Sequence, residues 1–212
     1  MPYRVKNIFG PTLQGEGPHA GAPCVFLRLT GCNAWDGRPE TRAASACPYC
    51  DTDFRGGDTL DIATIRARLA AFIPMGAPRY GCVLTGGEPL LQADAELLAA
   101  LGNDFAWVDI ETNGTRICPP RPANVQVVCS PKAVPNQAVV VEPDAWKILI
   151  PDQESFLPRA LASTKPVYVQ PTCPDGGPTG AAYQKNLARC LDICYREGCR
   201  LSLQTHKYLG IE

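Results

Sequence analysis

The chain has 212 residues, of which 45% are hydrophobic and 19% charged, and its formal net charge is -1. This composition supplies enough apolar surface for a sizeable core and excludes a disordered chain. The 20 basic and 21 acidic residues form no long run of either sign, which argues against a nucleic-acid-binding protein. The sequence has no apolar run of the roughly 18 residues that a membrane helix needs, and its first residues do not form a secretory signal. We therefore expect a cytoplasmic protein with neither a nucleic acid nor a membrane as partner.

The cysteine content points to metal ligation. Eleven cysteines are an odd number, and without an export signal they favour ligation chemistry over a complete disulfide framework. Some of them lie inside apolar runs, where a free thiol behaves as a small buried hydrophobe. We expect core positions for Cys82, Cys129, Cys190 and Cys194.

The first predicted element is a largely buried strand. Residues 24–30 form a short apolar run with one charged residue, Arg28, and the run ends at Gly31 before Cys32. Residues 33–46 are mostly small or polar and show no regular period. They predict a loop with at most one helical turn, which leads to Cys47.

A helix is predicted next, capped by Asp58 or Thr59 and reaching about Phe72, because apolar residues recur there at helical spacing. Beyond it, strands are expected at 82–85, 105–111, 125–129, 146–150, 167–170 and 201–204, and helices at 90–101, 154–162 and 187–195.

This alternation of strands and helices predicts a mostly parallel sheet in a single domain that spans residues 1–212. In a curled sheet of this kind, the functional loops gather at the carboxyl ends of the strands. Cys32, Glu88, Asn113, Ser130 and Gln170 all lie at such ends. We expect an α/β fold of the incomplete (β/α)6 type, a partial TIM barrel.

Cys32, Cys47 and Cys50 have the spacing C-x14-C-x2-C. The close pair brings two thiolates to one metal centre, and the long loop returns the third. A structural zinc site needs four ligands, whereas an iron–sulfur cluster held by three cysteines leaves one iron open to a cofactor. The alternative is a zinc knuckle completed by His19 or Cys24.

The sequence Thr85-Gly86-Gly87-Glu88-Pro89 follows a predicted strand. Its two glycines allow backbone groups to approach a ligand closely, and Glu88 offers an acceptor. A turn of this kind is often only structural, but its position one strand after the cysteine loop is the one that a site for S-adenosylmethionine (SAM) requires.

These residues resemble the radical SAM superfamily, although its common cysteine spacing is the shorter C-x3-C-x2-C. The longer spacing resembles one family within it, the 7-carboxy-7-deazaguanine synthases. The resemblance covers nearly the whole chain and is carried by the stretches 13–17 (LQGEG), 85–89 (TGGEP), 111–114 (ETNG), 130–132 (SPK) and 204–208 (QTHKY), with the cluster loop at 32–50.

The resemblance implies a radical SAM lyase that converts 6-carboxy-5,6,7,8-tetrahydropterin to 7-carboxy-7-deazaguanine with loss of ammonia. This reaction belongs to queuosine and 7-deazapurine biosynthesis. The implied cofactors are one 4Fe-4S cluster, SAM and Mg2+. A 5'-deoxyadenosyl radical from SAM takes hydrogen from the pterin, the ring contracts, and SAM is re-formed, so no side chain is expected as a catalytic acid or base. A flavodoxin- or ferredoxin-type electron donor and a homodimer are also expected.

Substrate contacts are expected on both edges of the pterin. Gln14 and Glu16 can meet the aminopyrimidinone edge with an amide and a carboxylate. Arg28 either meets the substrate carboxylate or lies at the surface with only its stem covered. His206 either donates to that carboxylate or is an ordinary hydrogen-bonded ring. The family resemblance adds Leu13, Gly87 and the terminal carboxylate of Glu212.

The residues expected to bind SAM have polar side chains or are glycines that let the backbone approach the ligand closely. They are Tyr49, Gly86, Gly87, Glu88, Thr112, Asn113, Ser130, Lys132 and Gln170. Tyr49, between the paired cysteines, can pack on adenine or act as a hydrophobic plug. Thr52 matches the position at which the family ligates Mg2+, and because one hydroxyl is a poor magnesium site, we expect the pterin to complete the shell.

Two other functions fit parts of the sequence. One is a different radical SAM enzyme, such as an activase that installs a glycyl radical on a protein, which would cleave SAM without acting on a free pterin. The other is a non-catalytic zinc-binding module, which would be colourless and contain zinc.

Overall fold

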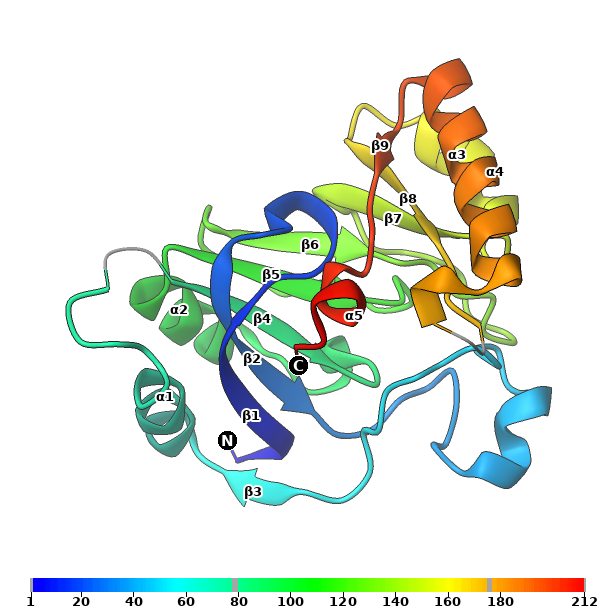
Figure 1. Cartoon of the computed structure of the whole chain (residues 1–212). Helices are drawn as coiled ribbons and strands as arrows, with labels where there is room; N and C mark the ends of the chain where they lie inside the picture. The colour runs from blue at the N-terminus through cyan, green and yellow to red at the C-terminus, as the bar shows by residue number, and fades with distance from the viewer. Residues whose placement is uncertain (1, 78–79, 175–176, 212) are drawn as a thin grey trace.

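The computed structural model describes residues 2–77, 80–174 and 177–211. In these ranges nine strands form one sheet in the order β3-β1-β2-β4-β5-β6-β7-β8-β9 (Figure 1). From β2 to β9 neighbouring strands pair in parallel, whereas β1 runs antiparallel to both β2 and β3. The strands are β1 (Tyr3–Leu13), β2 (Pro23–Leu29), β3 (Asp58–Leu60), β4 (Gly81–Gly86), β5 (Trp107–Thr112), β6 (Val125–Cys129), β7 (Ala145–Ile150), β8 (Val167–Pro171) and β9 (Arg200–Leu201).

Helices cover the outer face of this sheet at its two ends. Helix α1 contacts β1 and β2, α2 contacts α1 and β5, and α4 contacts β7 and β8 with α3 beside it (Figure 1). The helices are α1 (Ile62–Ala70), α2 (Ala95–Asp104), α3 (Leu157–Leu161), α4 (Ala181–Glu197) and α5 (Thr205–Leu209). Short 3-10 turns are η1 (Gly17–His19), η2 (Pro39–Ala44), η3 (Pro89–Leu91), η4 (Glu154–Phe156) and η5 (Gly177–Thr179).

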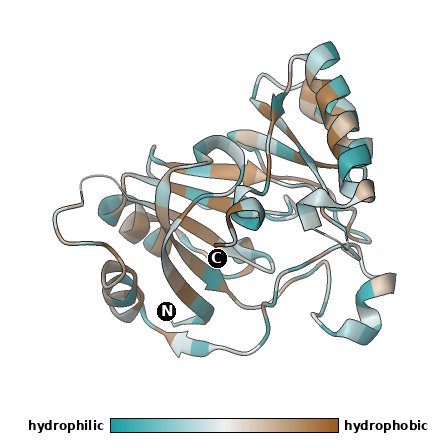
Figure 2. Ribbon diagram, in the orientation of Figure 1, coloured by the Kyte–Doolittle hydropathy of each residue, from teal (hydrophilic) through white to brown (hydrophobic). Residues whose placement is uncertain are grey.

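The parallel strands are apolar on one face and polar on the other. Successive side chains of a strand point to opposite faces, so residues of one parity share a face. In β2, Val25, Leu27 and Leu29 are fully buried in the core, and Figure 2 shows hydrophobic colour concentrated along the central strands. The alternate positions include Arg28 in β2 and Lys147 in β7, both of which line a cavity. The alternation thus separates a hydrophobic core under the helices from a polar interior.

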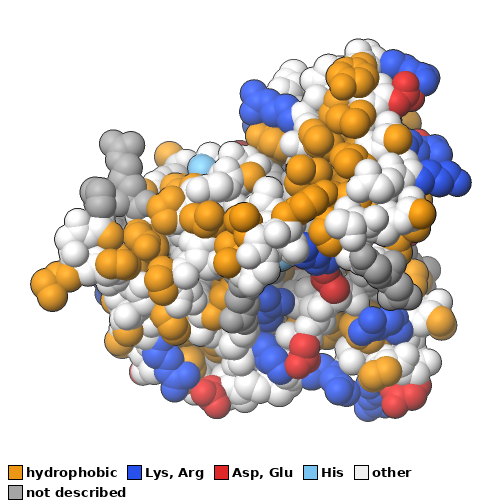
Figure 3. Space-filling view, in the orientation of Figure 1, with side chains coloured by type: hydrophobic (Ala, Val, Ile, Leu, Met, Phe, Trp, Pro, Cys, Tyr) orange, Lys and Arg blue, Asp and Glu red, His pale blue; other side chains and the backbone are white. Residues whose placement is uncertain are grey.

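The α/β fold with a mostly parallel, open sheet is confirmed, as are the strands predicted from 24 to 170. Cys82, Cys129 and Cys190 are buried as predicted, whereas Cys194 is only partly buried. On the face shown in Figure 3, basic and acidic side chains are interspersed, in keeping with the balanced composition. In the described part of the chain, no helix combines the length and the hydrophobicity needed to cross a bilayer.

The predicted start of the first helix is wrong. Asp58 and Thr59 belong to strand β3, because this segment pairs with the start of β1 through Tyr3 and Leu60. The helix begins after Asp61, whose carboxylate accepts a hydrogen bond from the Thr64 amide at 2.7 Å. Pairing with β1, which is distant in sequence, thus places Asp58 and Thr59 in a strand although either residue could cap a helix.

The predicted helix at 90–101 is also displaced. Pro89–Leu91 forms only a 3-10 turn, and α2 starts after Asp94, which caps the Leu97 amide at 2.9 Å. At the carboxyl terminus, the strand expected at 201–204 shortens to β9, and a short helix, α5, follows it. Strand β1 was not predicted, because Gly10-Pro11 and two register shifts against β2 interrupt its alternating pattern.

Candidate active site

A pocket of about 840 Å³ lies at the carboxyl ends of the parallel strands. This volume falls within the ordinary range for small-molecule sites. Most of the predicted site residues line it. They are Leu13, Gln14, Glu16, Arg28, Cys32, Cys47, Tyr49, Cys50, Thr52, Gly86, Gly87, Thr112, Asn113, Ser130, Lys132, Gln170 and His206.

The structure places Cys32, Cys47 and Cys50 together on the wall of this pocket. Cys32 follows β2 and accepts a hydrogen bond from the Ala34 amide at 3.3 Å, while a tight turn joins the Cys50 amide to the Cys47 carbonyl at 3.1 Å. In the described residues, no three His, Cys, Asp or Glu side chains form a site for a single metal ion. Thiolates that hold a cubane cluster bind separate irons, so the donor set of three cysteines fits a cluster.

The two paired thiols differ in acidity. The Cys47 thiol donates a hydrogen bond to Cys50. This bond, a backbone hydrogen bond at Thr52 and the charge of Lys132 together outweigh burial and lower the pKa of Cys50 to about 6. The same shared proton and burial raise the pKa of Cys47. Because the thiolate is the form that binds metal, Cys50 is prepared for ligation near neutral pH.

The proposed fourth ligands of a zinc knuckle lie at the opposite edge of the sheet. His19 Nδ1 hydrogen-bonds to the Asp109 carboxylate at 2.9 Å, and its ring stacks on Trp107 at 4.0 Å between centroids. Cys24 pairs with Gly81 at the start of β4. Five residues of β2, about 17 Å, separate Cys24 from Leu29 at the carboxyl end of the strand. The zinc alternative therefore lacks the ligand that it needs.

Gly87 packs directly against the cysteine loop. A Cβ atom at this position would lie 2.3 Å from the Gly31 carbonyl oxygen and 2.5 Å from the Cys32 Cβ. The Glu88 amide also donates to the Gly31 carbonyl at 2.9 Å. Glycine is required at position 87 because the backbone there touches the backbone of the cysteine loop. The sequence alone had suggested a different reason, the close approach of a ligand.

We expect the Gly87→Ala variant to bind little iron and to lose about 1–3 kcal/mol of folding free energy, because the added methyl group overpacks a backbone contact. Iron analysis after anaerobic reconstitution, together with urea denaturation, measures both effects. Wild-type iron content and stability in the variant would show that the cysteine loop moves away at no cost.

Glu88 does not line the pocket and is fully buried below it. Its Oε1 accepts hydrogen bonds from the Leu90 amide at 2.9 Å and the Thr112 hydroxyl at 2.8 Å, and its Oε2 accepts one from the Asn113 amide at 2.7 Å. Burial raises the pKa of Glu88, and the three hydrogen bonds oppose that shift. The carboxylate thereby ties the end of β4 to the end of β5.

The residues predicted to meet SAM come together at the ends of β5 and β6. Lys132 Nζ donates to the Ser130 carbonyl at 3.0 Å and lies 5.8 Å from the centre of the Tyr49 ring. Gln153, which sequence reasoning missed, donates to the Ser130 hydroxyl at 3.1 Å and to the Tyr49 hydroxyl at 3.4 Å. Further along the sheet, the buried Gln170 accepts from Ser202 Oγ at 2.7 Å.

On the substrate side, Arg28 points into the pocket. Its guanidinium lies 5.6 Å from the centre of the Phe9 ring, and Phe9 stacks on Phe26 at 4.7 Å. Gln14 is 3% exposed, and its Nε2 has no hydrogen-bond partner in the described structure. A buried orphan donor aimed at a cavity is a feature that a bound acceptor would satisfy.

His206 and Thr52 line the pocket on neighbouring segments, because Lys207 pairs with Asp51 at 2.8 Å. The Thr205 amide donates to the Gly15 carbonyl at 3.0 Å, which brings His206 against Gly15, and burial lowers the pKa of His206. The Thr52 carbonyl is 4.0 Å from the Cys50 sulfur. Glu212, the predicted terminal contact, lies outside the described residues.

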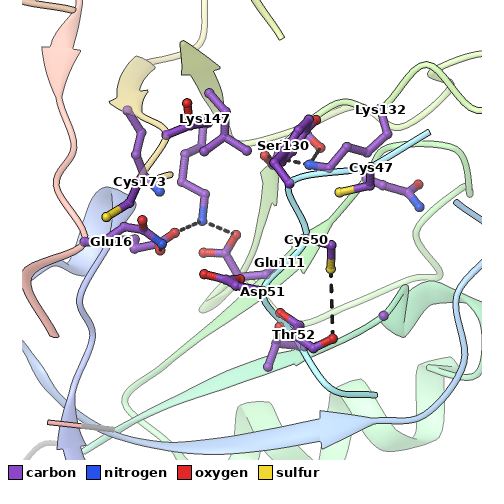
Figure 4. Close-up of a pocket in the computed structure, with 18 of the residues that line it drawn as sticks. Glu16, Cys47, Cys50, Asp51, Thr52, Glu111, Ser130, Lys132, Lys147 and Cys173 are labelled. Carbon is purple, nitrogen blue, oxygen red and sulfur yellow. Dashed lines mark hydrogen bonds and ion pairs between the residues drawn. The ribbon is translucent and has the colours of Figure 1, made fainter. Parts of the chain in front are cut away.

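A buried lysine that sequence reasoning missed occupies the pocket interior. Lys147 Nζ lies 2.6 Å from Glu16 Oε2 and 2.6 Å from Glu111 Oε2 (Figure 4). Gln204 Nε2 donates to the other oxygen of Glu16 at 2.9 Å. Lys147 is the one charged residue in the apolar strand β7. Arg28 was predicted as a site residue because it is a lone charge in an apolar strand, and the same pattern would have predicted Lys147.

No protein-family model matches the chain. Over its full length it is similar to several curated proteins that share one name. It is 43% identical to the 7-carboxy-7-deazaguanine synthase of Bordetella pertussis and 40% identical to that of Burkholderia multivorans, with 100% of both chains covered in each case. QueE from Escherichia coli has a similar fold, with a TM-score of 0.71 at 23% identity, over 95% of this chain and 93% of that one.

Proposed function

Because the chain belongs to the 7-carboxy-7-deazaguanine synthase family, we propose that it converts 6-carboxy-5,6,7,8-tetrahydropterin to 7-carboxy-7-deazaguanine with release of ammonia. The observation that carries this proposal is the identity of 40–43% with relatives of that name over the whole of both chains. The pocket supports it, because three cysteines and a buried orphan amide donor face one cavity.

Cys32, Cys47 and Cys50 would hold a 4Fe-4S cluster, and the low pKa of Cys50 favours the thiolate that ligation requires. Cluster and SAM together supply the radical that takes hydrogen from the substrate. Tyr49, Ser130 and Lys132 would position SAM beside the cysteines. The backbone of Gly86 and Gly87 and the side chains of Thr112, Asn113 and Gln170 would complete that side of the pocket, with Glu88 acting from below by holding Thr112 and Asn113.

The pterin would lie across the pocket with its two edges in opposite electrostatic surroundings. Gln14 and Glu16 present an amide donor and a carboxylate, which suit the donors and acceptors of the aminopyrimidinone edge. Arg28 suits the substrate carboxylate. His206 lies against Gly15, at the Gln14 and Glu16 end, and would be a further substrate contact there. Leu13, Gly87 and Glu212 complete the proposed substrate contacts.

Thr52 would contribute a hydroxyl ligand to Mg2+. This ion prefers oxygen ligands and keeps several waters, so substrate oxygens would complete the shell. We also propose a flavodoxin- or ferredoxin-type electron donor, a homodimer, a cytoplasmic location and a single domain.

The test is anaerobic reconstitution with iron and sulfide, followed by incubation with the pterin, SAM, a reductant and Mg2+. We expect a brown protein that forms 7-carboxy-7-deazaguanine and ammonia in equal amounts while SAM is not consumed in proportion. Cleavage of SAM without loss of the pterin would instead indicate an activase. A colourless protein that contains zinc would overturn the proposal.

A further inference from the structure

Lys147 is a buried cation that no proposed step uses. Its side chain is 6% exposed, and it projects from β7 between Glu16, which follows β1, and Glu111 of β5. A buried ammonium is costly unless it is paired and hydrogen-bonded. Both of its ion pairs are 2.6 Å long, and Figure 4 shows the three side chains converging inside the pocket.

This cluster of Lys147, Glu16 and Glu111 gives one end of the pocket a net negative charge, since one cation faces two carboxylates. Burial raises the pKa of Glu16, but the charge and hydrogen bond of Lys147 outweigh it and lower the value to about 2. Burial also raises the pKa of Glu111, and there Lys147 offsets the effect only in part. Glu111 is therefore the carboxyl group that depends most on the lysine to stay ionised.

The opposite polarity is found on the other side of the pocket. Arg28 lies on β2, and β4 separates β2 from β5, which carries Glu111. A molecule with hydrogen-bond donors at one edge and a carboxylate at the other would be oriented by these two charges. The pterin of the proposed function has that arrangement.

We propose that Lys147 is a positioning residue that keeps Glu16 and Glu111 ionised together, so that this end of the pocket accepts hydrogen bonds from the amino-bearing edge of the pterin and directs its carboxylate toward Arg28. Since the pterin is the substrate of the proposed function, the inference rests on that function. Without the lysine, two buried carboxylates would face each other, and one would take up a proton. A protonated carboxyl group donates where the substrate needs an acceptor.

The test compares Lys147→Met with Lys165→Met, the same change at an exposed lysine. At neutral pH we expect the KM of Lys147→Met for the pterin to rise about 10- to 100-fold, because a charged acceptor is lost, with a smaller change in kcat. The KM of this variant should fall as the pH rises, because the shared proton then leaves. Wild type and Lys165→Met should lack this fall in KM.

Infrared spectroscopy of the substrate-free protein provides a second measurement. We expect a protonated carboxyl band at neutral pH in Lys147→Met that is absent from wild type. Lys147→Met/Glu111→Gln keeps one carboxylate without repulsion, so it should fold, lack the band and lack the fall in KM with rising pH. Removal of Lys147 with neither a new band nor a pH-dependent KM would overturn the inference.

The two proposals fail differently. Wild-type protein that does not convert the pterin would refute the proposed function, and the infrared comparison would still decide whether Lys147 keeps both carboxylates ionised. Turnover by wild type with no effect of Lys147→Met on the profile or the band would refute the role of Lys147 alone.

Discussion

Replacement of Cys50 with alanine is expected to abolish cluster binding and turnover. Cys50 lines the pocket and has the lowest thiol pKa of the described cysteines for which a value is resolved, about 6. A cluster held by two thiolates in place of three loses one iron ligand and exposes a second iron. After anaerobic reconstitution, we expect iron to fall from about four atoms per chain to a small fraction of that, with the loss of the brown colour.

The matched control is Cys118→Ala. Cys118 is partly buried and lies outside the pocket, so the same loss of a sulfur atom should leave iron content and turnover unchanged. Circular dichroism of both variants checks that they are folded. Full iron content and turnover in Cys50→Ala would refute the assignment of this thiol as a cluster ligand.

Replacement of Glu88 with alanine is expected to give the largest loss of stability. The variant removes an acceptor from three buried donors, the amides of Leu90 and Asn113 and the hydroxyl of Thr112, and it leaves a cavity. Together these effects cost about 3–5 kcal/mol. Urea denaturation measures that loss. SAM binding should weaken at least about tenfold, because Thr112 and Asn113 lose their anchor.

Glu88→Gln separates charge from hydrogen bonding. An amide oxygen can keep the bonds from Leu90 and Thr112, but its NH2 group then faces the Asn113 amide, so we expect a smaller loss of about 1–3 kcal/mol. Glu142→Gln, the same change at an exposed position, should be neutral. Equal stability of Glu88→Gln and wild type would show that the bond to Asn113 contributes nothing.

The difference in stability between wild type and Glu88→Gln should depend on pH, because the pKa of Glu88 is raised. Its folded-state value lies above the ordinary 4.5, so between these two values the folded state holds a proton that the unfolded state has lost. Wild-type stability from this group is therefore greatest at low pH and declines as the pH rises through the folded-state pKa. The advantage of wild type over Glu88→Gln should be larger at about pH 4.5 than at about pH 8.

Much of the fold follows from local pattern. The apolar run at 24–30 predicted a strand because a buried strand needs little beyond alternating or continuous apolar side chains, and β2 occupies Pro23–Leu29. β1 was missed because its pairing with β2 is irregular at two places, so no simple period marks it. The start of α1 was misplaced because Asp58 can cap a helix or join a strand, and only the pairing with β1 decides between them.

The sequence by itself determined the cysteine motif, the strand and helix alternation and a set of site residues, most of which line the pocket. These depend on residue type and short spacing, and polar residues after parallel strands must meet at one edge of the sheet. Only the tertiary structure decided which distant groups touch. It brought Lys147 to Glu16 across 131 residues and placed His19 and Cys24 at the edge away from the cysteine loop. Such contacts depend on the order and curvature of the strands in the sheet, and local pattern carries no information about either.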